Sequence, residues 1–257
     1  MKITLTRYIV AIAAGLMLAA TSANAGVRVV NCDEGDSLQE AIDSGAGSAK
    51  PLEIELLGTC YEEVDITRDR VSIIGNGDTT IVGRIRAIDS DVILLENLTI
   101  TGPGTGLTVA GGRVSLNYSS ISGNDGNGIS VFQNGGVTLF HCVVEGNSGH
   151  GIWLNDGASR IRVTEVAHNG ENGIGVTNGG ALRFYGGGVN FHDNGSGILV
   201  TNNSSIDLGN THVGMGNPNG IELDLGSTAL ITDSFMNANA REGIKLSANS
   251  AAEVSGG

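Results

Sequence analysis

The chain has 257 residues, a formal net charge of −13, and few aromatic residues, which make up 4% of the sequence. This excess of acidic residues excludes a general nucleic-acid-binding surface, because binding to phosphate backbones needs clustered positive charge. It would also repel a polyanionic sugar unless a basic patch or a bound cation intervened. The length suits one solenoid domain or two small globular ones, and 41 glycines against 3 prolines suit many tight turns.

Residues 1–25 have the pattern of a secretory signal peptide. Lys2 and Arg7 supply the positive start, Ile9–Ala20 supplies the apolar run, and Ala23–Ala25 supplies a small-residue cleavage site. The apolar run is short for a bilayer span, and no other hydrophobic stretch approaches its length. We therefore predict cleavage after Ala25, no membrane span in the mature chain, a mature net charge of −15, and export to the periplasm or the cell exterior.

Residues 26–51 are predicted to form an N-terminal cap. Val27–Val30 is a candidate first strand, and Ser37 followed three residues later by Glu40 is a capping box that begins a short helix. The helix runs through Asp43 and stops at Gly45. Its apolar residues share one face: Leu38, Ala41 and Ile42. An amphipathic helix here would cover the open end of a stack of strands, whose backbone groups would otherwise be unpaired.

The chain has three cysteines. Export would place them in an oxidising compartment, so Cys32 and Cys60 are predicted to form a disulfide at the N-terminal end. Cys142 has no partner in the sequence pattern and is predicted to be a small, half-buried side chain.

From Leu107 onward the chain repeats a glycine followed by an aliphatic residue. The repeated pairs are Gly106-Leu107, Gly128-Ile129, Gly151-Ile152, Gly173-Ile174, Gly197-Ile198, Gly220-Ile221 and Gly243-Ile244. The steps between the aliphatic residues are 22, 23, 22, 24, 23 and 23 residues. Asparagines precede the last six aliphatic residues by four or five positions: Asn124, Asn147, Asn169, Asn194, Asn217 and Asn239. A period this short and regular indicates a solenoid.

One period, residues 137–158, contains three short runs separated by turns rich in Gly, Asn, Asp and Ser. The runs are Val137–Phe140, Val143–Gly146 and Gly151–Leu154. Such runs predict strands, and three strands per period, wound continuously, predict a parallel β-helix. Alternation along the third strand places Ile152 and Leu154 in the core, so Trp153 and Asn155 face outward. The asparagines are expected to line one turn and to hydrogen-bond from coil to coil.

This pattern resembles the right-handed parallel β-helix repeat family of the pectin-lyase-like superfamily, over residues 52–257. The resemblance implies an all-β, right-handed, single-stranded parallel β-helix with three short parallel sheets and about nine coils. Ile54 and Ile81 are expected to extend the ladder backwards from Leu107, with steps of 27 and 26 residues. The fold hosts lyases, hydrolases, esterases, epimerases, adhesins and phage proteins, so it does not by itself name an activity.

A further strand is predicted to begin at Ala252, and no capping helix or polar terminal repeat follows it in the sequence. Solenoids need such caps for solubility. We therefore expect residues 52–257 to be an incomplete β-helix, with a partner that covers the last coil as the alternative.

The ladder strand is the first place to test for chemistry, since the resemblance implies a cleft on the face of one parallel sheet. Glu222 and Asp224 are expected to face the same way and could hold Ca²⁺. With Lys245 one coil further on, they form the predicted catalytic set, in which a base of lowered pKa removes the proton beside a uronate carboxyl, as in a lyase. The alternative is a cross-strand ion pair between Glu222 and Lys245.

Phe132 and Trp153, one coil apart, are expected to be exposed aromatic residues that contact a sugar. Together with Asn155 on the same strip and Arg241 in the turn before Lys245, they form the predicted ligand-binding set. The alternative is that the two rings pack together and cover the sheet.

A small basic cluster is expected on a different face, with Phe140 nearby: Arg160, Arg162 and Arg183. It is the one place where an anionic chain would be attracted, with a solvated, charge-balancing surface as the alternative.

Five histidines are scattered over the coils without a spacing that gathers metal ligands: His141, His150, His168, His192 and His212. Gly149-His150-Gly151 matches a motif of polygalacturonases, but the paired aspartates that those enzymes also need are missing from the sequence. His150 is therefore interpreted as a turn residue.

Two functions remain open. The first is an exported carbohydrate-directed protein, in the form of a lyase or related enzyme acting on acidic polysaccharide with Ca²⁺ as a possible cofactor. The alternative is a non-catalytic surface protein, an adhesin-like or structural scaffold. The short turns favour the second because they leave any cleft shallow, whereas the export signal and the outward aromatic and charged residues favour the first.

Overall fold

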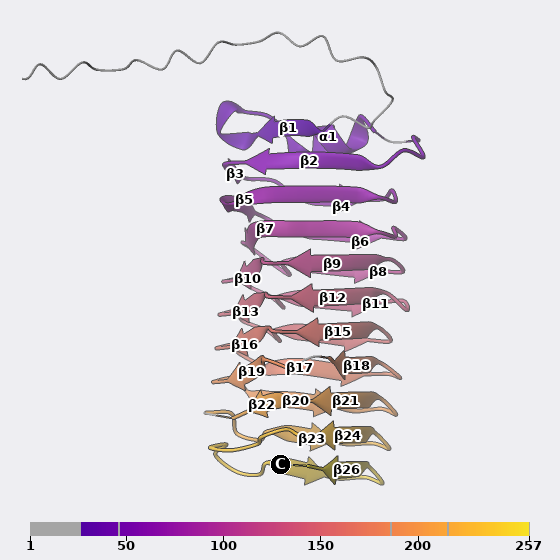
Figure 1. Cartoon of the computed structure of the whole chain (residues 1–257), viewed down its shortest axis with the longest axis vertical. Helices are drawn as coiled ribbons and strands as arrows, with labels where there is room; N and C mark the ends of the chain where they lie inside the picture. Colours follow the sequence, from indigo (N-terminus) through magenta and orange to yellow (C-terminus); the bar gives the residue numbers. More distant parts are fainter. Residues whose placement is uncertain (1–26, 46, 186, 215, 257) are drawn as a thin grey trace, which may run out of the picture.

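The computed structural model describes residues 27–45, 47–185, 187–214 and 216–256. They form a right-handed parallel β-helix of about ten coils, stacked along one axis with the N-terminal cap at one end (Figure 1). The predicted signal peptide and its cleavage site at Ala25 lie outside the described residues. In the described part of the chain, no helix is both long and apolar enough to cross a membrane.

The repeated aliphatic residues all lie on one sheet, here called the ladder sheet. Its strands, in order along the axis, are β4 (Val64–Ile66), β6 (Ile85–Ile88), β8 (Leu107–Ala110), β11 (Ile129–Phe132), β14 (Ile152–Asn155), β17 (Asn172–Thr177), β20 (Ser196–Val200), β23 (Ile221–Leu223) and β25 (Ile244–Leu246). Leu107 pairs with Ile129, Ile129 with Ile152, and the register continues unbroken to Ile244. The predicted ladder is therefore confirmed.

A second sheet, the long sheet, precedes the corner of each coil. Its strands are β1 (Arg28–Asn31), β2 (Leu52–Leu57), the first part of β5 (Val71–Val82), the first part of β7 (Ile93–Thr101), β9 (Arg113–Asn117), β12 (Gly136–Phe140), β15 (Ala158–Arg162), β18 (Ala181–Phe184), β21 (Ser205–Gly209), β24 (Thr228–Thr232) and β26 (Ala251–Ser255).

The third sheet, the short sheet, follows the corner. It contains β3 (Thr59–Cys60), the second parts of β5 and β7, β10 (Ser120–Ser122), β13 (Val143–Glu145), β16 (Glu165–Ala167), β19 (Val189–His192) and β22 (Thr211–Val213). Because β5 and β7 run through the corner, they join the long and short sheets into one hydrogen-bonded network.

The backward extension of the ladder through Ile54 and Ile81 is wrong. Ile54 lies in β2 of the long sheet, and Ile81 lies in the part of β5 that belongs to the short sheet. The residues that precede Leu107 on the ladder are Ile85 and Val64. The continuous strands β5 and β7 change the spacing of aliphatic residues here, so the glycine–aliphatic pattern fades although the coil itself continues.

The core is built by simple alternation. Ile152 and Leu154 of β14 are fully buried, while Trp153 and Asn155 are only partly exposed on the outer side, as predicted. Leu139 of β12 fills the same interior from another sheet. Each fully buried aliphatic side chain contributes roughly 1.5–3 kcal/mol, and a single coil has nothing to bury it against, so the stack forms cooperatively.

The asparagines form a buried ladder in the turn between the short sheet and the ladder sheet. The side-chain amide of Asn147 donates to the side-chain carbonyl of Asn169 at 2.9 Å, and Asn169 donates to Asn194 at 2.9 Å. The same side chains also pair with backbone groups, such as the Val144 carbonyl at 3.1 Å from Asn169. The glycine after each asparagine keeps this space clear: a Cβ on Gly151 would come within 2.8 Å of the Asn169 amide nitrogen.

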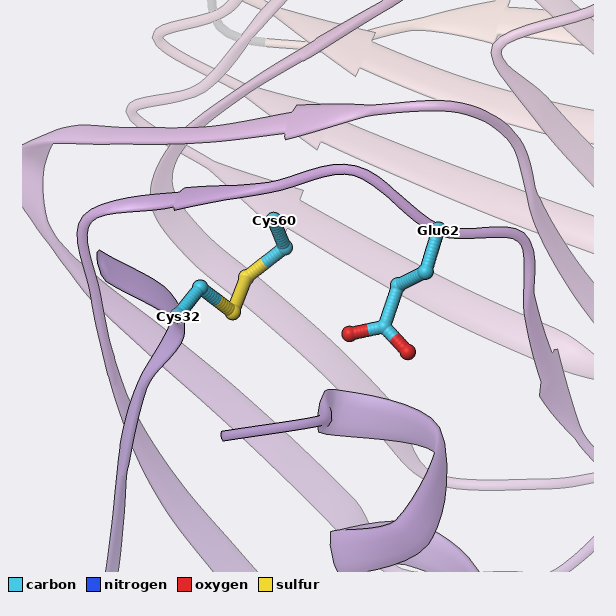
Figure 2. A group of neighbouring side chains, drawn as sticks. All are labelled: Cys32, Cys60 and Glu62. Carbon is cyan, nitrogen blue, oxygen red and sulfur yellow. A yellow bond between two sulfur atoms is a disulfide. The ribbon is translucent and has the colours of Figure 1, made fainter. Parts of the chain in front are cut away.

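The cap lies over the first coil. Helix α1 spans Leu38–Asp43, and its buried residues are Leu38, Ala41 and Ile42. The Ser37 side chain accepts a hydrogen bond from the Glu40 N–H at 3.2 Å. The 3₁₀ helix η1 (Cys32–Glu34) precedes it. Cys32 and Cys60 form a disulfide, with Cα atoms 5.0 Å apart, that joins the cap to the coil beneath it (Figure 2).

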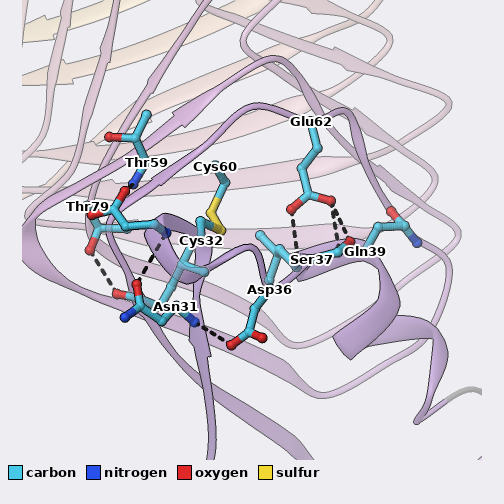
Figure 3. The surroundings of a disulfide bond; sticks show 12 residues. Asn31, Cys32, Asp36, Ser37, Gln39, Thr59, Cys60, Glu62 and Thr79 are labelled. Carbon is cyan, nitrogen blue, oxygen red and sulfur yellow. Dashed lines mark hydrogen bonds between the residues drawn. A yellow bond between two sulfur atoms is a disulfide. The ribbon is translucent and has the colours of Figure 1, made fainter.

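A carboxylate from the first coil completes the start of α1. Glu62 accepts hydrogen bonds from the Ser37 hydroxyl at 2.9 Å and from the Leu38 and Gln39 N–H groups at 2.7 and 3.2 Å (Figure 3). These N–H groups have no partner within the helix, and a negative charge at this end also complements the helix dipole. The cap is thus tied to the coils by one covalent bond and by this carboxylate.

Candidate functional site

Glu222 and Lys245 lie side by side on the ladder sheet and form an ion pair. The second oxygen of Glu222 accepts a hydrogen bond from the Asn219 amide at 3.0 Å. The hydrogen bond and the negative charge of Glu222 raise the pKa of Lys245 above its ordinary value. Lys245 therefore holds its proton firmly, and the expected lowering of its pKa is not found.

Asp224 follows β23 and turns to a different task. Its Oδ1 accepts hydrogen bonds from the Ser247 hydroxyl at 2.7 Å and from the Leu225 N–H at 2.9 Å. Glu222 and Asp224 belong to no group of three or more closely spaced metal-ligand residues in the part of the chain that the structure describes. A Ca²⁺ ion takes six to eight oxygen ligands, so this pair of already engaged carboxylates fits such an ion poorly.

The predicted pairing of Phe132 with Trp153 is wrong. The register places Ser130, not Phe132, beside Trp153. Trp153 instead stacks on His150, with ring centroids 4.4 Å apart and planes inclined by 9°. On its other side the indole lies over Gly175, where an added Cβ would come within 2.4 Å of the Trp153 ring. The tryptophan is therefore packed between its neighbours on the sheet.

His150 occupies a half-closed position in the turn before β14. The Asn172 N–H donates to its Nδ1 at 3.2 Å, so the proton of the neutral ring is on Nε2, which lies 2.8 Å from a Glu171 carboxylate oxygen. Burial lowers the pKa of His150, while the charge of Glu171 acts in the opposite direction. The ring is thus a neutral donor that supports Trp153.

The other two residues of the predicted ligand-binding set are separate from this pair. The Asn155 side-chain carbonyl accepts from the Asn178 amide at 2.8 Å, and Asn178 in turn accepts from Asn202 at 3.1 Å. These three amides form an exposed second ladder. Arg241 is exposed, and its backbone N–H donates to the Pro218 carbonyl at 2.8 Å. The structure does not bring Phe132, Trp153, Asn155 and Arg241 together into one site.

The outer face of the long sheet is hollowed along the axis. Three adjoining hollows of 550, 330 and 520 Å³ lie on it. The first two share Arg160, and the second and third share Thr138 in their linings. We call this continuous surface the arginine trough, and define it by Arg113, Thr138, Phe140, Arg160, Arg162, Arg183 and Tyr185.

The arginines of the trough differ in how they are neutralised. Arg113 pairs with Asp91 at 3.3 Å and Arg183 pairs with Asp207 at 3.2 Å, both in exposed positions. Within the described ranges, Arg160 and Arg162 form no ion pair with a carboxylate. The trough therefore keeps positive charge on the surface of an acidic protein.

Aromatic rings border the trough where the long sheet ends. Tyr118 stacks on His141 of the next coil, with centroids 5.1 Å apart, and the Phe140 ring meets both of them edge-on. The guanidinium of Arg162 lies 5.3 Å from the centre of the Phe140 ring. Tyr118 and His141 have positive φ values of 49° and 52°, so both occupy the same left-handed position of successive turns.

The predicted cluster of Arg160, Arg162 and Arg183 near Phe140 thus lies in the trough, but Tyr118 and Tyr185 were missed. Their signal is present in the sequence as spacing. Tyr118 precedes His141 by 23 residues, which is one coil. Because these residues lie in turns, outside any alternating strand pattern, neither the strand rule nor the ladder marks them.

The family model for the right-handed beta helix region matches residues 62–186. No curated protein sequence matches this chain significantly. Among solved structures, pectate lyase Pel9A is similar with a TM-score of 0.61 and 12% identity, over 89% of this chain and 78% of that one.

Two other structures are similar at the same level. An alginate lyase from Paenibacillus sp. has a TM-score of 0.55 and 12% identity, over 85% of this chain and 99% of that one. Tailspike protein 2 of an Escherichia coli O157:H7 bacteriophage has a TM-score of 0.57 and 14% identity, over 88% of this chain and 42% of that one. At such identities the likeness concerns the fold. The coil architecture and the family match together make this chain a right-handed parallel β-helix protein.

Proposed function

We propose that this protein binds an extended acidic polysaccharide along the arginine trough. The observation that carries the proposal is the pair Arg160 and Arg162, which lie in a continuous surface without a carboxylate partner in the described part of the chain. Successive coils are spaced about 4.8 Å apart. A linear polymer lying along the axis would therefore meet a new set of outward side chains at each coil.

Charge and ring chemistry support this class of ligand. The overall acidity repels a polyanion elsewhere, so local positive charge decides where it docks. Planar guanidinium groups suit carboxylates because they form paired hydrogen bonds. Phe140 and Tyr185 line the same hollow as Arg162, and exposed aromatic faces can pack against the apolar faces of sugar rings.

The structural neighbours support a carbohydrate-directed role in the same way. The pectate lyase and the alginate lyase are named for acidic polysaccharides. Binding without cleavage has more support than a lyase reaction at Glu222, Asp224 and Lys245. The raised pKa of Lys245 makes it a poor base, and Asp224 is engaged by Ser247 and the Leu225 N–H.

Calorimetric titration with polygalacturonate and alginate fragments tests the proposal, with neutral dextran as the control ligand. The double variant Arg160→Gln/Arg162→Gln should bind about tenfold more weakly, because two partly exposed charged contacts are together worth about 1.4 kcal/mol. Arg241→Gln is the matched control, since it removes an exposed arginine from another face, and it should bind as the wild type does. Equal binding of dextran, or an unaffected double variant, would contradict the proposal.

The alternative of turnover has its own readout. Purified protein incubated with the same polymers, with and without Ca²⁺, is followed for new ultraviolet absorbance and for new reducing ends. Product that disappears in Lys245→Met but persists in Arg241→Gln would move the function to the predicted lyase set. No product alongside saturable binding supports the binding role.

We also propose export, on the basis of residues 1–25 and of the Cys32–Cys60 disulfide, a bond typical of oxidising compartments. N-terminal sequencing of protein recovered from the periplasm or the medium should begin at Gly26. Recovery of protein that retains Lys2 in the cytoplasm would contradict this.

A further inference from the structure

Two histidines and two carboxylates gather where the short sheet ends on consecutive coils. β16 pairs with β19 so that Ala167 lies beside His192, and the N–H of His168 donates to the carbonyl of His192 at 3.2 Å. His168 and Asp193 have positive φ values of 55° and 53°. Both therefore leave their strands through the same left-handed turn, one coil apart.

The contacts within this group are close. His192 Nδ1 lies 2.8 Å from Asp193 Oδ2, and His168 Nδ1 lies 3.9 Å from the same oxygen. The two imidazole rings are nearly perpendicular, with centroids 5.2 Å apart. One ligand atom from each of His168, His192 and Asp193 falls within 4.8 Å of the other two.

We propose that His168, His192 and Asp193 bind a divalent transition-metal ion of the zinc class. Zinc holds imidazole nitrogen and carboxylate oxygen at about 2.0–2.2 Å, so two ligand atoms of a tetrahedral site lie roughly 3.3 Å apart. The separations of 2.8 and 3.9 Å bracket that value. Three protein ligands at an exposed turn leave the fourth position to water.

The position of Glu165 is a second, independent observation. Its Oε1 lies 2.8 Å from His192 Nε2, the ring nitrogen that faces away from Asp193. A histidine that ligates a metal usually donates its other N–H to a carboxylate, which fixes the tautomer and orients the ring. Glu165 supplies that contact here, so it is a positioning residue, and Nδ1 is the nitrogen left to face the metal.

The neighbouring coil leaves room for this arrangement. Gly216 has φ +92°, and a Cβ there would lie 2.1 Å from Asp193 Oδ1. A side chain at this position would therefore displace the carboxylate. The other group of closely spaced ligand residues, Cys32, Cys60 and Glu62, does not compete in the oxidised protein (Figure 2), because its sulfur atoms are joined in the disulfide and zinc binds the thiolate.

Zinc binding to the untagged, chelator-treated full chain tests the proposal under non-reducing conditions. Calorimetry should give one Zn²⁺ per chain with a dissociation constant below about 10 μM. A hundredfold excess of Zn²⁺ over that constant should raise Tm by about 5 °C or more, because the ion binds only the folded state. Co²⁺ in the same site should show the visible bands of tetrahedral coordination.

The variants separate ligands from bystanders. His168→Gln changes an exposed side chain and should lose most of the affinity. Glu165→Gln should weaken binding by about tenfold and leave the metal-free Tm unchanged. His212→Gln, on the next coil, is the matched control and should bind as the wild type does. The proposal is overturned if the wild type shows no saturable binding, or if His168→Gln binds Zn²⁺ as tightly as the wild type.

Discussion

His150 stacks on Trp153 with ring centroids 4.4 Å apart, although the two residues enter the contact from a turn and from strand β14. The histidine side chain is 12% exposed. Trp153 is the only tryptophan in the chain. Its fluorescence therefore reports on this one contact, and two of the predictions below use it.

The first prediction concerns pH. Burial lowers the pKa of His150 in the folded state, whereas the unfolded chain has the ordinary value of about 6.5. Below that value the unfolded chain binds more protons than the folded one, so this residue makes stability fall as the pH falls from about 7 toward the lower folded-state pKa. His150→Gln should show a smaller loss of Tm over this range, and His212→Gln should keep the wild-type slope.

The same titration should change the emission of Trp153, because the ring stacked on it gains a charge. Trp153 emission in the wild type should follow the ionisation of His150, and His150→Gln should abolish the transition. A wild-type slope in Tm for His150→Gln, together with a pH-independent emission in the wild type, would count against the assigned role of His150.

The second prediction concerns Gly175, which the Trp153 ring covers. A Cβ at this position would lie 2.4 Å from the Trp153 ring. Gly175→Ala should therefore push the indole away from His150, shift its emission to longer wavelength and lower stability by about 1–2 kcal/mol. Gly136→Ala is the control, because its Cβ would meet nothing closer than 3.6 Å; unchanged emission in Gly175→Ala would contradict the packing.

The third prediction concerns the buried amide ladder. Asn169 accepts from the N–H and the amide of Asn147, and it donates to the Val144 carbonyl. Asn169→Ala leaves these buried groups without partners and should lower the free energy of unfolding by about 2–3 kcal/mol in urea denaturation.

Asn178→Ala removes a similar amide from the exposed second ladder, where water replaces the lost partners. Its effect should stay within about 0.5 kcal/mol. Equal effects of the two substitutions would show that burial does not decide the strength of these ladders.

The fourth prediction concerns the disulfide of the cap. Cys32 and Cys60 are 28 residues apart in sequence, and closing a loop of this length should stabilise the folded state by about 3–4 kcal/mol. Cys32→Ser/Cys60→Ser should lower the free energy of unfolding by this amount. A reductant should lower the Tm of the wild type and leave that of the double variant unchanged; equal sensitivity of both proteins would contradict the role of this bond.

Local patterns in the sequence predicted most of the architecture. The steps of 22 to 24 residues, the alternation around Ile152 and the capping residue Ser37 each act over a few neighbours or one fixed period. Such signals depend on side-chain alternation and on turn chemistry, which neighbouring residues determine. The error at Ile54 and Ile81 arose where strands run through a corner and the period no longer marks the coil.

The grouping of outward residues followed rules that the period alone does not state. Trp153 lies 21 residues after Phe132, whereas the local coil has 23, so its true neighbour is Ser130. His168 and His192 showed no recognisable metal spacing. Only the register and the left-handed turn bring His168 beside Asp193, within reach of the ring of His192.

The sequence by itself determined that this chain forms a rod of stacked coils with a capped N-terminal end, because the repeat and the cap are encoded over short distances. The tertiary structure alone decided which surface residues meet, since contacts between coils depend on register and on the direction of side chains at turns. It also decided their charge states: Glu222 raises the pKa of Lys245, and burial lowers the pKa of His150. Proton affinity depends on burial and on neighbouring charge, neither of which is visible along the chain.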